Sequence, residues 1–180
     1  MQPVHAVLSS PQRWVVAALV AAALACVAAP AEARRPAPPA RASETRAVVR
    51  AVDGDTLVLD GGEKLRLLGI DAPETERTRR KTGPECFGRE ASDRVRALTV
   101  GRRVRLEFEP GETRDRYGRT LAWVRLEDGS LLNEALVRDG YARAYRRMPR
   151  SRLAAFEAAE REAKSARRGL WGPACEGRRR

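Results

Sequence analysis

The feature that most constrains the fold is the stretch 51–75, where apolar runs of strand length alternate with tight-turn sequences. Asp53-Gly54-Asp55 and Asp60-Gly61-Gly62 are typical of hairpin turns, because aspartate and glycine readily adopt the backbone conformations that such turns need. Pro73 then ends the sheet, since proline cannot donate a hydrogen bond to a strand ladder. The pattern predicts three short strands, at 47–52, 56–59 and 63–70.

The order of the later elements indicates a fold class. Apolar residues at helical spacing, each run followed by a glycine, predict helices, and alternating apolar residues predict two further strands. A helix inserted after the third of five short strands matches a Greek-key barrel, so we expect an α+β, five-stranded OB-fold β-barrel with three α-helices. The predicted segments are a basic loop at 76–82, helices at 88–100, 132–138 and 151–168, strands at 102–108 and 120–126, and an extended or irregular segment at 141–145.

The N-terminus has the features of a secretory signal peptide. Arg13 precedes an alanine-rich apolar run at 14–29, and Ala31-Glu32-Ala33 offers a small-x-small cleavage site. The run is short for a membrane span. We therefore expect a signal peptide at 1–33, cleavage near Ala33, and a secreted or periplasmic protein with no stable membrane association after cleavage. The alternatives are an uncleaved anchor and lipidation at Cys26.

Composition divides the remaining chain into three parts. Residues 34–45 are rich in proline, alanine and charge, which predicts a disordered linker. The periodic apolar pattern at 46–172 predicts one domain with a modest core. Residues 173–180 form a basic C-terminal tail.

Cysteine usage agrees with export. Removal of the signal peptide removes Cys26 and leaves Cys86 and Cys175. Two cysteines in a small domain in an oxidising compartment usually form a disulfide, which here would tie the start of the middle helix to the tail. In a cytosolic protein the same pair would be two free thiols.

The net charge and the histidine content limit the kinds of reaction that the protein can catalyse. The chain of 180 residues has a formal net charge of +11 and a single histidine, His5, inside the predicted signal peptide. A mature chain without histidine excludes a Ser-His-Asp triad, a Cys-His pair and histidine-based zinc sites. The arginine excess favours a polyanionic partner only weakly, because arginine and alanine also rise with genomic GC content. Hydrolysis would have to use carboxylates, arginines, tyrosines or a hard metal ion.

Carboxylates gather in the same stretch that predicts the hairpins. Asp53 and Asp55 lie in the first turn, and Asp71 and Glu74 follow the third strand. Each turn alone is ordinary, but together they can converge at one end of a barrel. Carboxylates with one backbone carbonyl form an incomplete oxygen shell that suits Ca²⁺, with water filling the remainder. Zinc is disfavoured because no cysteine or histidine cluster is present.

Two arginines are candidates to face this carboxylate group. Arg66 shares a predicted strand face with Leu68 and Ile70, where a guanidinium group is costly unless an anion or hydrogen-bond acceptors meet it. The alternative is an edge position from which Arg66 reaches solvent. Arg119 follows the turn Asp115-Arg116-Tyr117-Gly118 and would lie across the cleft, with Tyr117 able to stack on a base; otherwise this turn is a solvated hairpin.

Four motifs occur in order along the chain: Val52-Asp53-Gly54-Asp55-Thr56, the run from Leu65 to Thr75 (LRLLGIDAPET), Asp115-Arg116-Tyr117-Gly118-Arg119 and the run from Leu132 to Val137 (LNEALV). With these motifs the chain resembles the thermonuclease family, typified by staphylococcal nuclease, over about 46–171. The resemblance implies the OB-fold barrel with three helices, the use of Ca²⁺, DNA and RNA as substrates, 3′-phosphate products and a monomer.

The resemblance also implies roles for individual residues. The metal would be held by carboxylates and one main-chain carbonyl, the scissile phosphate by two arginines, and the nucleotide by residues of the later turn. Ala72 stands where the type protein has threonine, and the type protein lacks the cysteine pair. By this resemblance Asp55, Asp71 and the Ala72 carbonyl are metal ligands, Glu74 orients or deprotonates the attacking water, Arg66 and Arg119 hold the phosphate, and Arg116, Tyr117 and, as a looser match, Tyr145 bind the nucleotide.

Two other classes of function fit parts of the sequence. A non-catalytic OB-fold module that binds single-stranded nucleic acid explains the fold and the charge, but does not need Asp55, Asp71 and Glu74 beside two arginines. A basic protein of the cell envelope that binds anionic surfaces explains the charge alone.

Overall fold

The computed structural model describes residues 42–75, 83–111, 113–147 and 150–177. The predicted signal peptide, most of the predicted linker and the predicted basic loop at 76–82 lie outside these residues. Within the described ranges, none of the helices has both the length and the apolar composition required to cross a membrane.

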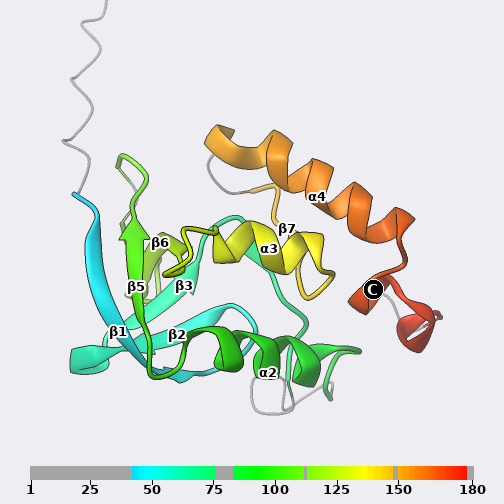
Figure 1. Cartoon of the computed structure of the whole chain (residues 1–180), viewed down its shortest axis with the longest axis horizontal. Coiled ribbons are helices and arrows are strands. Elements are labelled where there is room, and N and C mark those ends of the chain that lie inside the picture. Colours follow the sequence, from blue (N-terminus) through cyan, green and yellow to red (C-terminus); the bar gives the residue numbers. More distant parts are fainter. Residues whose placement is uncertain (1–41, 76–82, 112, 148–149, 178–180) are drawn as a thin grey trace, which may run out of the picture. The chain divides into compact units, whose positions relative to one another are not determined.

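Five strands close into a barrel (Figure 1). Neighbouring strands around the barrel are, in order, β1 (Glu44–Ala51), β2 (Thr56–Leu59), β3 (Lys64–Leu67), β6 (Thr120–Arg125) and β5 (Arg103–Glu107), and only β3 and β6 run parallel to each other. This arrangement confirms the expected α+β barrel of the OB type with three α-helices. The elements are β1 (Glu44–Ala51), β2 (Thr56–Leu59), β3 (Lys64–Leu67), β4 (Ile70–Asp71), α2 (Gly88–Thr99), β5 (Arg103–Glu107), β6 (Thr120–Arg125), α3 (Leu132–Arg138), β7 (Arg143–Ala144) and α4 (Leu153–Ser165).

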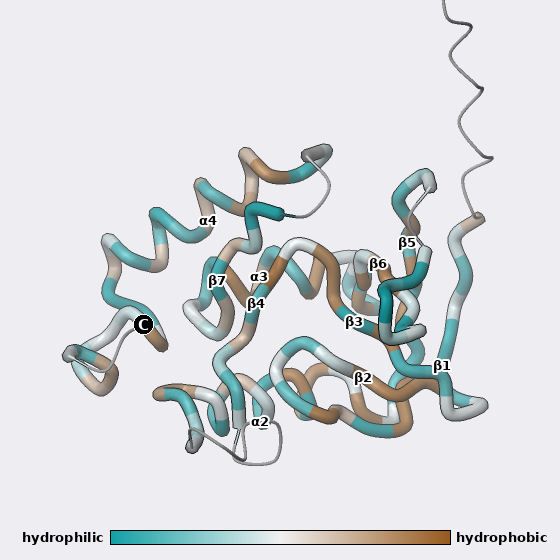
Figure 2. Tube along the Cα trace, turned by 180° about the vertical axis from the view of Figure 1, so that it is seen from behind, coloured by the Kyte–Doolittle hydropathy of each residue, from teal (hydrophilic) through white to brown (hydrophobic). Residues whose placement is uncertain are grey.

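Aliphatic side chains from the strands fill the barrel, and the helices cover it. Every residue of β2 is buried, and β3 and β5 alternate between buried and less buried positions, as strands with one core-facing side do. Figure 2 shows apolar residues concentrated along β2 and β3. Helix α3 contacts both β6 and α4, and α4 also reaches the barrel directly, because the ring of Phe156 lies 5.3 Å from the ring of Trp123 on β6. Removal of this apolar surface from water is the main stabilising contribution to the domain.

The prediction of one strand at 63–70 is wrong. β3 ends at Leu67, a turn follows, and β4 then pairs with β7, away from the barrel. Gly69 has φ of 73°, and a Cβ at this position would lie 2.8 Å from the ring of Trp123. The turn therefore needs glycine for both its conformation and its packing. The segment at 141–145, expected to be extended or irregular, contains the short strand β7, the partner of β4.

The ends of the domain differ from the predicted boundaries. β1 starts at Glu44, inside the predicted linker, because Glu44 and Thr45 pair with β5. At the other end Pro173–Cys175 forms a turn of 3-10 helix in the predicted tail. Helix α4 is shorter than predicted, because a 3-10 turn occupies Arg150–Arg152 and Arg167 adopts φ of 51° after its end.

The structure contains the disulfide expected between Cys86 and Cys175. Their Cα atoms are 5.6 Å apart, and 89 positions of sequence separate them. The bond joins the residues just before α2 to the 3-10 turn at the C-terminal end of the described chain.

Candidate active site

The first turn and β3 bring a buried carboxylate against a guanidinium group. Asp53 Oδ1 accepts the Asp55 N–H at 3.0 Å, which closes the turn that presents Asp55 at the end of the barrel. Arg66 lies on β3 directly opposite Thr56, the residue after Asp55. The pairing of β2 with β3 therefore places Arg66 Nη1 at 2.9 Å from Asp55 Oδ2.

Arg66 is held by acceptors on several sides. Its guanidinium group donates to the Leu67 carbonyl at 3.2 Å and to the Ile70 carbonyl at 2.9 Å, in addition to Asp55. The side chain is only 15% exposed, so Arg66 does not extend into solvent from a strand edge. Hydrogen-bond acceptors and an anion compensate the cost of placing this cation in an apolar strand, which is the first of the two alternatives that the sequence left open.

Asp55 carries its charge in an unfavourable environment. Burial raises the pKa of Asp55 to about 7; the Arg66 charge and the Ala72 N–H oppose that rise, and the neighbouring Asp53 adds to it. The Ala72 N–H donates to Asp55 Oδ2 at 3.0 Å, and the Thr56 hydroxyl donates to Oδ1 at 3.1 Å. A further positive charge near Asp55 would stabilise its ionised form.

Asp71 lies on the other side of the same guanidinium group. Its Oδ1 is 3.7 Å from Arg66 Nη2, and its side chain is 55% exposed. The N–H of Ala72, the next residue, is bonded to Asp55, so the exit from β4 is attached directly to the first turn.

These donors fit the chemistry of Ca²⁺. Asp55, Asp71 and the Ala72 carbonyl offer hard oxygen atoms, which Ca²⁺ prefers. In the part of the chain that the structure describes, no group of three or more Asp, Glu, Cys or His side chains could hold a metal ion. Asp55, Asp71 and the Ala72 carbonyl would supply three oxygen ligands, and water or substrate would fill the other positions.

Arg119 reaches this group from a separate hairpin. Asp115 Oδ2 accepts the Arg119 Nε–H at 2.7 Å, while Asp115 Oδ1 accepts the main-chain N–H groups of Tyr117 and Arg119. Arg119 Nη1 lies 3.4 Å from Thr56 Oγ1, and Thr56 in turn donates to Asp55. The Thr56 hydroxyl therefore lies between Arg119 and the Asp55–Arg66 ion pair. Sequence reasoning missed this role, because it depends on the register that places Thr56 opposite Arg66, which no local sequence pattern specifies.

The base of the hairpin is fixed by Glu63. This carboxylate accepts from Arg114 Nη2 at 2.8 Å, from Arg46 Nη1 at 2.9 Å and from the Thr120 hydroxyl. The hydrogen bond from Thr120, opposed by burial and supported by the Arg46 hydrogen bond and the Arg114 charge, lowers the pKa of Glu63. Glu63 therefore stays ionised and joins both ends of the hairpin to β1.

Tyr117 is an exposed aromatic ring beside two cations. It is 68% exposed, and the guanidinium carbons of Arg116 and Arg119 lie 4.8 Å and 5.5 Å from its ring centroid. Arg116 Nη2 also donates to the Tyr117 hydroxyl at 2.7 Å. An exposed ring flanked by guanidinium groups can stack a base while the cations meet phosphate oxygens.

Two of the predicted site residues are not joined to this group. Glu74 is attached through its main chain to Glu85, with its N–H donating to Glu85 Oε2 at 3.2 Å. The Tyr145 N–H donates to the Gly69 carbonyl at 2.9 Å. Among the described residues, no hydrogen bond or ion pair is found between the Glu74 or Tyr145 side chain and Asp55, Arg66 or Arg119.

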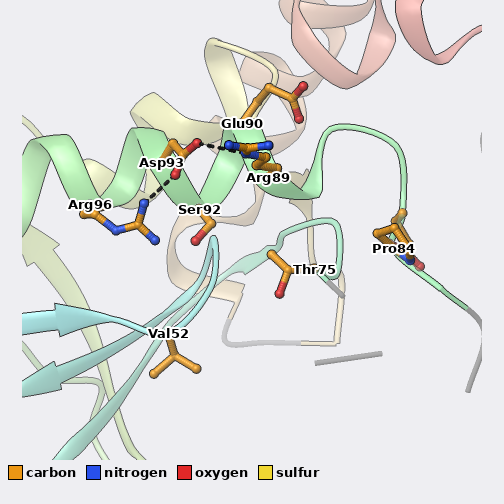
Figure 3. A pocket seen from close by; sticks show the side chains of 9 residues that line it. Val52, Thr75, Pro84, Arg89, Glu90, Ser92, Asp93 and Arg96 are labelled. Atoms are coloured by element: carbon orange, nitrogen blue, oxygen red, sulfur yellow. Dashed lines mark hydrogen bonds and ion pairs between the residues drawn. The ribbon is translucent and has the colours of Figure 1, made fainter. Parts of the chain in front are cut away.

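A hollow of about 510 Å³ adjoins the first turn (Figure 3). It lies between α2 and the turn, and its charged side chains largely neutralise one another: Asp93 is in contact with both Arg89 and Arg96. Its lining does not include the Asp55, Arg66 and Arg119 side chains, so the hollow is a neighbour of the candidate site and not its centre. The lining residues are Val52, Thr75, Pro84, Glu85, Arg89, Glu90, Ser92, Asp93 and Arg96.

Comparison with known proteins agrees with the fold and the motifs. A family described as staphylococcal nuclease homologue matches residues 64–173, a range that contains Arg66, Asp71 and Arg119 and begins after Asp55. The thermonuclease of Staphylococcus hyicus is 37% identical over 132 residues, which cover 71% of this chain and 76% of that protein. The thermonuclease of Staphylococcus intermedius is 36% identical over 132 residues, with the same shares covered. Endonuclease YncB of Bacillus subtilis is 39% identical over 127 residues, 68% of this chain and 59% of YncB. The chain belongs to the staphylococcal nuclease homologue family.

Proposed function

We propose that this protein is a Ca²⁺-dependent nuclease that hydrolyses phosphodiester bonds of DNA and RNA with little sequence preference and leaves 3′-phosphate ends. Membership of a family whose relatives are named thermonuclease and endonuclease supports nuclease activity. The observation that carries the proposal is the convergence of Asp55, Arg66 and Asp71 at one end of the barrel, with Arg119 attached to them through Thr56.

Substrate binding uses the cations and the exposed ring. Tyr117 stacks a base, Arg116 lies beside it, and Arg119 holds a non-bridging phosphate oxygen from the hairpin side. Arg66 meets the same phosphate from the barrel side, with its position already fixed by Asp55 and two carbonyl groups. Asp55, Asp71 and the Ala72 carbonyl would hold a Ca²⁺ ion, which would supply positive charge beside the phosphate.

The reaction is an in-line displacement at phosphorus. The water oxygen forms a bond to phosphorus, and the bond from phosphorus to the 5′-oxygen breaks. Glu74 orients the water or takes its proton, and the 5′-oxygen leaves as a hydroxyl after taking up a proton from solvent. Arg66 and Arg119 stabilise the charge that grows on the non-bridging oxygens, which preorganised donors do without reorganisation cost.

A metal series with end-group analysis tests the proposal. The chain from Arg34 onward is incubated with single- and double-stranded DNA and RNA in Ca²⁺, Mg²⁺, Mn²⁺ or chelator. Cleavage that requires Ca²⁺ and yields 3′-phosphate ends is the expected result. Binding that persists in chelator without any cleavage would instead identify a non-catalytic OB-fold module.

Replacement of Arg119 by alanine is expected to lower turnover by roughly 10²–10³-fold, as for other single charge-stabilising donors. The matched control is Arg161→Ala, because Arg161 is exposed on α4 and far along the chain from the candidate site. Equal turnover of Arg119→Ala and Arg161→Ala would remove Arg119 from the site.

We also propose export of the protein with cleavage near Ala33, followed by function as a monomer outside the cytoplasm. The features that support export are the apolar run at 14–29 and the Cys86–Cys175 disulfide, since disulfides persist in oxidising compartments. N-terminal sequencing of the protein from periplasm or medium is expected to begin at Arg34. Retention of residues 1–33 on protein in the membrane fraction would contradict this.

A further inference from the structure

Residues 85–88, which lead into α2 and include its first residue, contact the main chain of Glu74. The Glu74 N–H donates to Glu85 Oε2 at 3.2 Å, and the Glu85 N–H donates back to the Glu74 carbonyl at 2.9 Å. The two residues therefore exchange hydrogen bonds in both directions. Both main-chain polar groups of Glu74 are occupied by one partner, which restrains the direction in which its side chain leaves the backbone.

Gly88 packs directly against the same peptide. A Cβ on Gly88 would lie 2.4 Å from the Glu74 carbonyl oxygen and 2.9 Å from its carbon. Neither atom can move away easily, because the oxygen already accepts from Glu85. Only glycine permits α2 to begin this close to Glu74.

The segment is fixed on its other side as well. Cys86 is bonded to Cys175, and Phe87 adopts φ of 72° with its ring 5.4 Å from the ring of Tyr141. A left-handed conformation is costly for a bulky residue and persists only where the surroundings impose it. The disulfide and the ring contact thus attach residues 85–88 to the C-terminal part of the domain.

We propose that Glu85 is a positioning residue for Glu74, and that the Cys86–Cys175 disulfide keeps the Glu85 segment in place for that purpose. The inference rests on the proposed function in taking Glu74 as the residue that handles the attacking water. Glu85 itself does not touch the substrate. Its loss leaves binding intact but allows Glu74 to shift, and a displacement on the order of 1 Å at a reacting group can lower turnover about 10²-fold.

Kinetics of three variants test Glu85. Glu85→Ala is expected to lower kcat by roughly 10–100-fold with KM changed by less than about two-fold, since positioning is lost and binding is kept. Glu85→Gln retains an oxygen that accepts the Glu74 N–H and is expected to keep near wild-type kcat. Glu90→Ala is the matched control, an exposed glutamate on the first turn of α2.

A double-variant cycle separates positioning from general stability. In a Glu74→Ala background, Glu85→Ala is expected to have no further effect on kcat, because the residue it positions is already absent. The paired change Cys86→Ser and Cys175→Ser is likewise expected to have no further effect on kcat in the Glu74→Ala background. It is assayed at a temperature where circular dichroism shows a folded protein. A fall in kcat that is equally large in the Glu74→Ala background, or no fall in the wild-type background, overturns the inference.

Amide hydrogen exchange provides a readout that does not need activity. The Glu74 N–H is expected to exchange at least 10-fold faster in Glu85→Ala and in the paired cysteine variant than in the wild type or Glu85→Gln. If the wild-type protein cleaves no nucleic acid, the proposed function is wrong, but the exchange rate of the Glu74 amide still tests whether Glu85 and the disulfide hold the Glu74 main chain in place. Unchanged protection of the Glu74 amide in both variants would show that Glu85 and the disulfide do not hold it.

Discussion

The buried ion pair of Asp55 and Arg66 affects both the stability of the protein and the chemistry proposed for the site. Both side chains are removed from water, at 12% and 15% exposed, and each is the other's nearest opposite charge at 2.9 Å. Desolvation of two charges offsets most of the attraction between them, so such a pair adds little net stability. Loss of one partner is different, because the remaining charge is left buried without compensation. Arg66, the residue proposed to face a phosphate, is therefore also the structural counter-ion of Asp55.

Replacement of Arg66 by methionine is expected to cost roughly 3 kcal/mol of unfolding free energy, because Asp55 stays buried without its partner. Asp55→Asn removes that charge and keeps an oxygen for the Ala72 N–H. The double variant is therefore expected to be more stable than Arg66→Met alone. Urea denaturation of the two single variants and the double variant measures the coupling. Strictly additive losses would show that the ion pair is not the origin of the cost.

At the scale of elements, one buried carboxylate attaches α4 to β7 and to the chain after it. The Glu160 side chain is 4% exposed and accepts from the Ala144 N–H at 3.0 Å, from Arg146 at 3.2 Å and from Lys164 at 2.7 Å. Burial alone would raise the pKa of Glu160, but Lys164, the Ala144 N–H and Arg146 together lower it. The carboxylate is thus stabilised in its ionised form, and it connects α4 to β7, the strand that pairs with β4.

Glu160→Gln is expected to cost about 2 kcal/mol at neutral pH, the range of hydrogen bonds to charged groups. Because folding lowers the pKa of Glu160, its contribution is present above the unfolded value of about 4.3 and is lost as the pH falls through the folded pKa. The difference between variant and wild type is therefore expected to shrink below about pH 4. Urea denaturation at a series of pH values checks this, with the more exposed Glu157→Gln as the control. A difference that does not change with pH would assign the loss to packing.

For the whole molecule, the relevant quantity is the excess of positive charge. The net charge of +11 includes the exposed arginines Arg50 at the end of β1 and Arg102 just before β5, and among the described residues neither has an acidic partner within 4 Å. Unpaired surface cations attract a polyanion over a distance set by ionic strength. Binding of nucleic acid should thus depend on charges well outside the candidate site.

The affinity of the Glu74→Ala variant for a single-stranded oligonucleotide is expected to fall by roughly 10-fold or more between 50 and 200 mM salt, with a logarithmic slope of about −0.7 for each phosphate contacted. Fluorescence anisotropy in chelator measures this without cleavage. A peptide nucleic acid of the same sequence, which has no phosphates, is the control. Equal salt dependence for the two ligands would exclude phosphate contacts as the source of affinity.

Turn chemistry made much of the fold and of the candidate site predictable. Asp53-Gly54-Asp55 and Asp60-Gly61-Gly62 were identified as turns, and the helix at 132–138 was predicted with its observed bounds, because these signals act within a few residues. The strand at 63–70 was predicted wrongly, because the need for glycine at 69 depends on the ring of Trp123, far away in the sequence. Alternation of apolar residues could not show that β4 leaves the barrel to pair with β7.

The sequence by itself determined the barrel, the acidic and basic residues available for chemistry and the cysteine pair, since local periodicity and composition are sufficient for these. Only the tertiary structure decided that Asp55 is bonded to Arg66, that Thr56 connects Asp55 to Arg119, and that Glu74 is held by Glu85. Such contacts depend on strand register and on the packing of α2 against the chain that leaves β4. They arise between segments brought together by the core, and no local pattern specifies them.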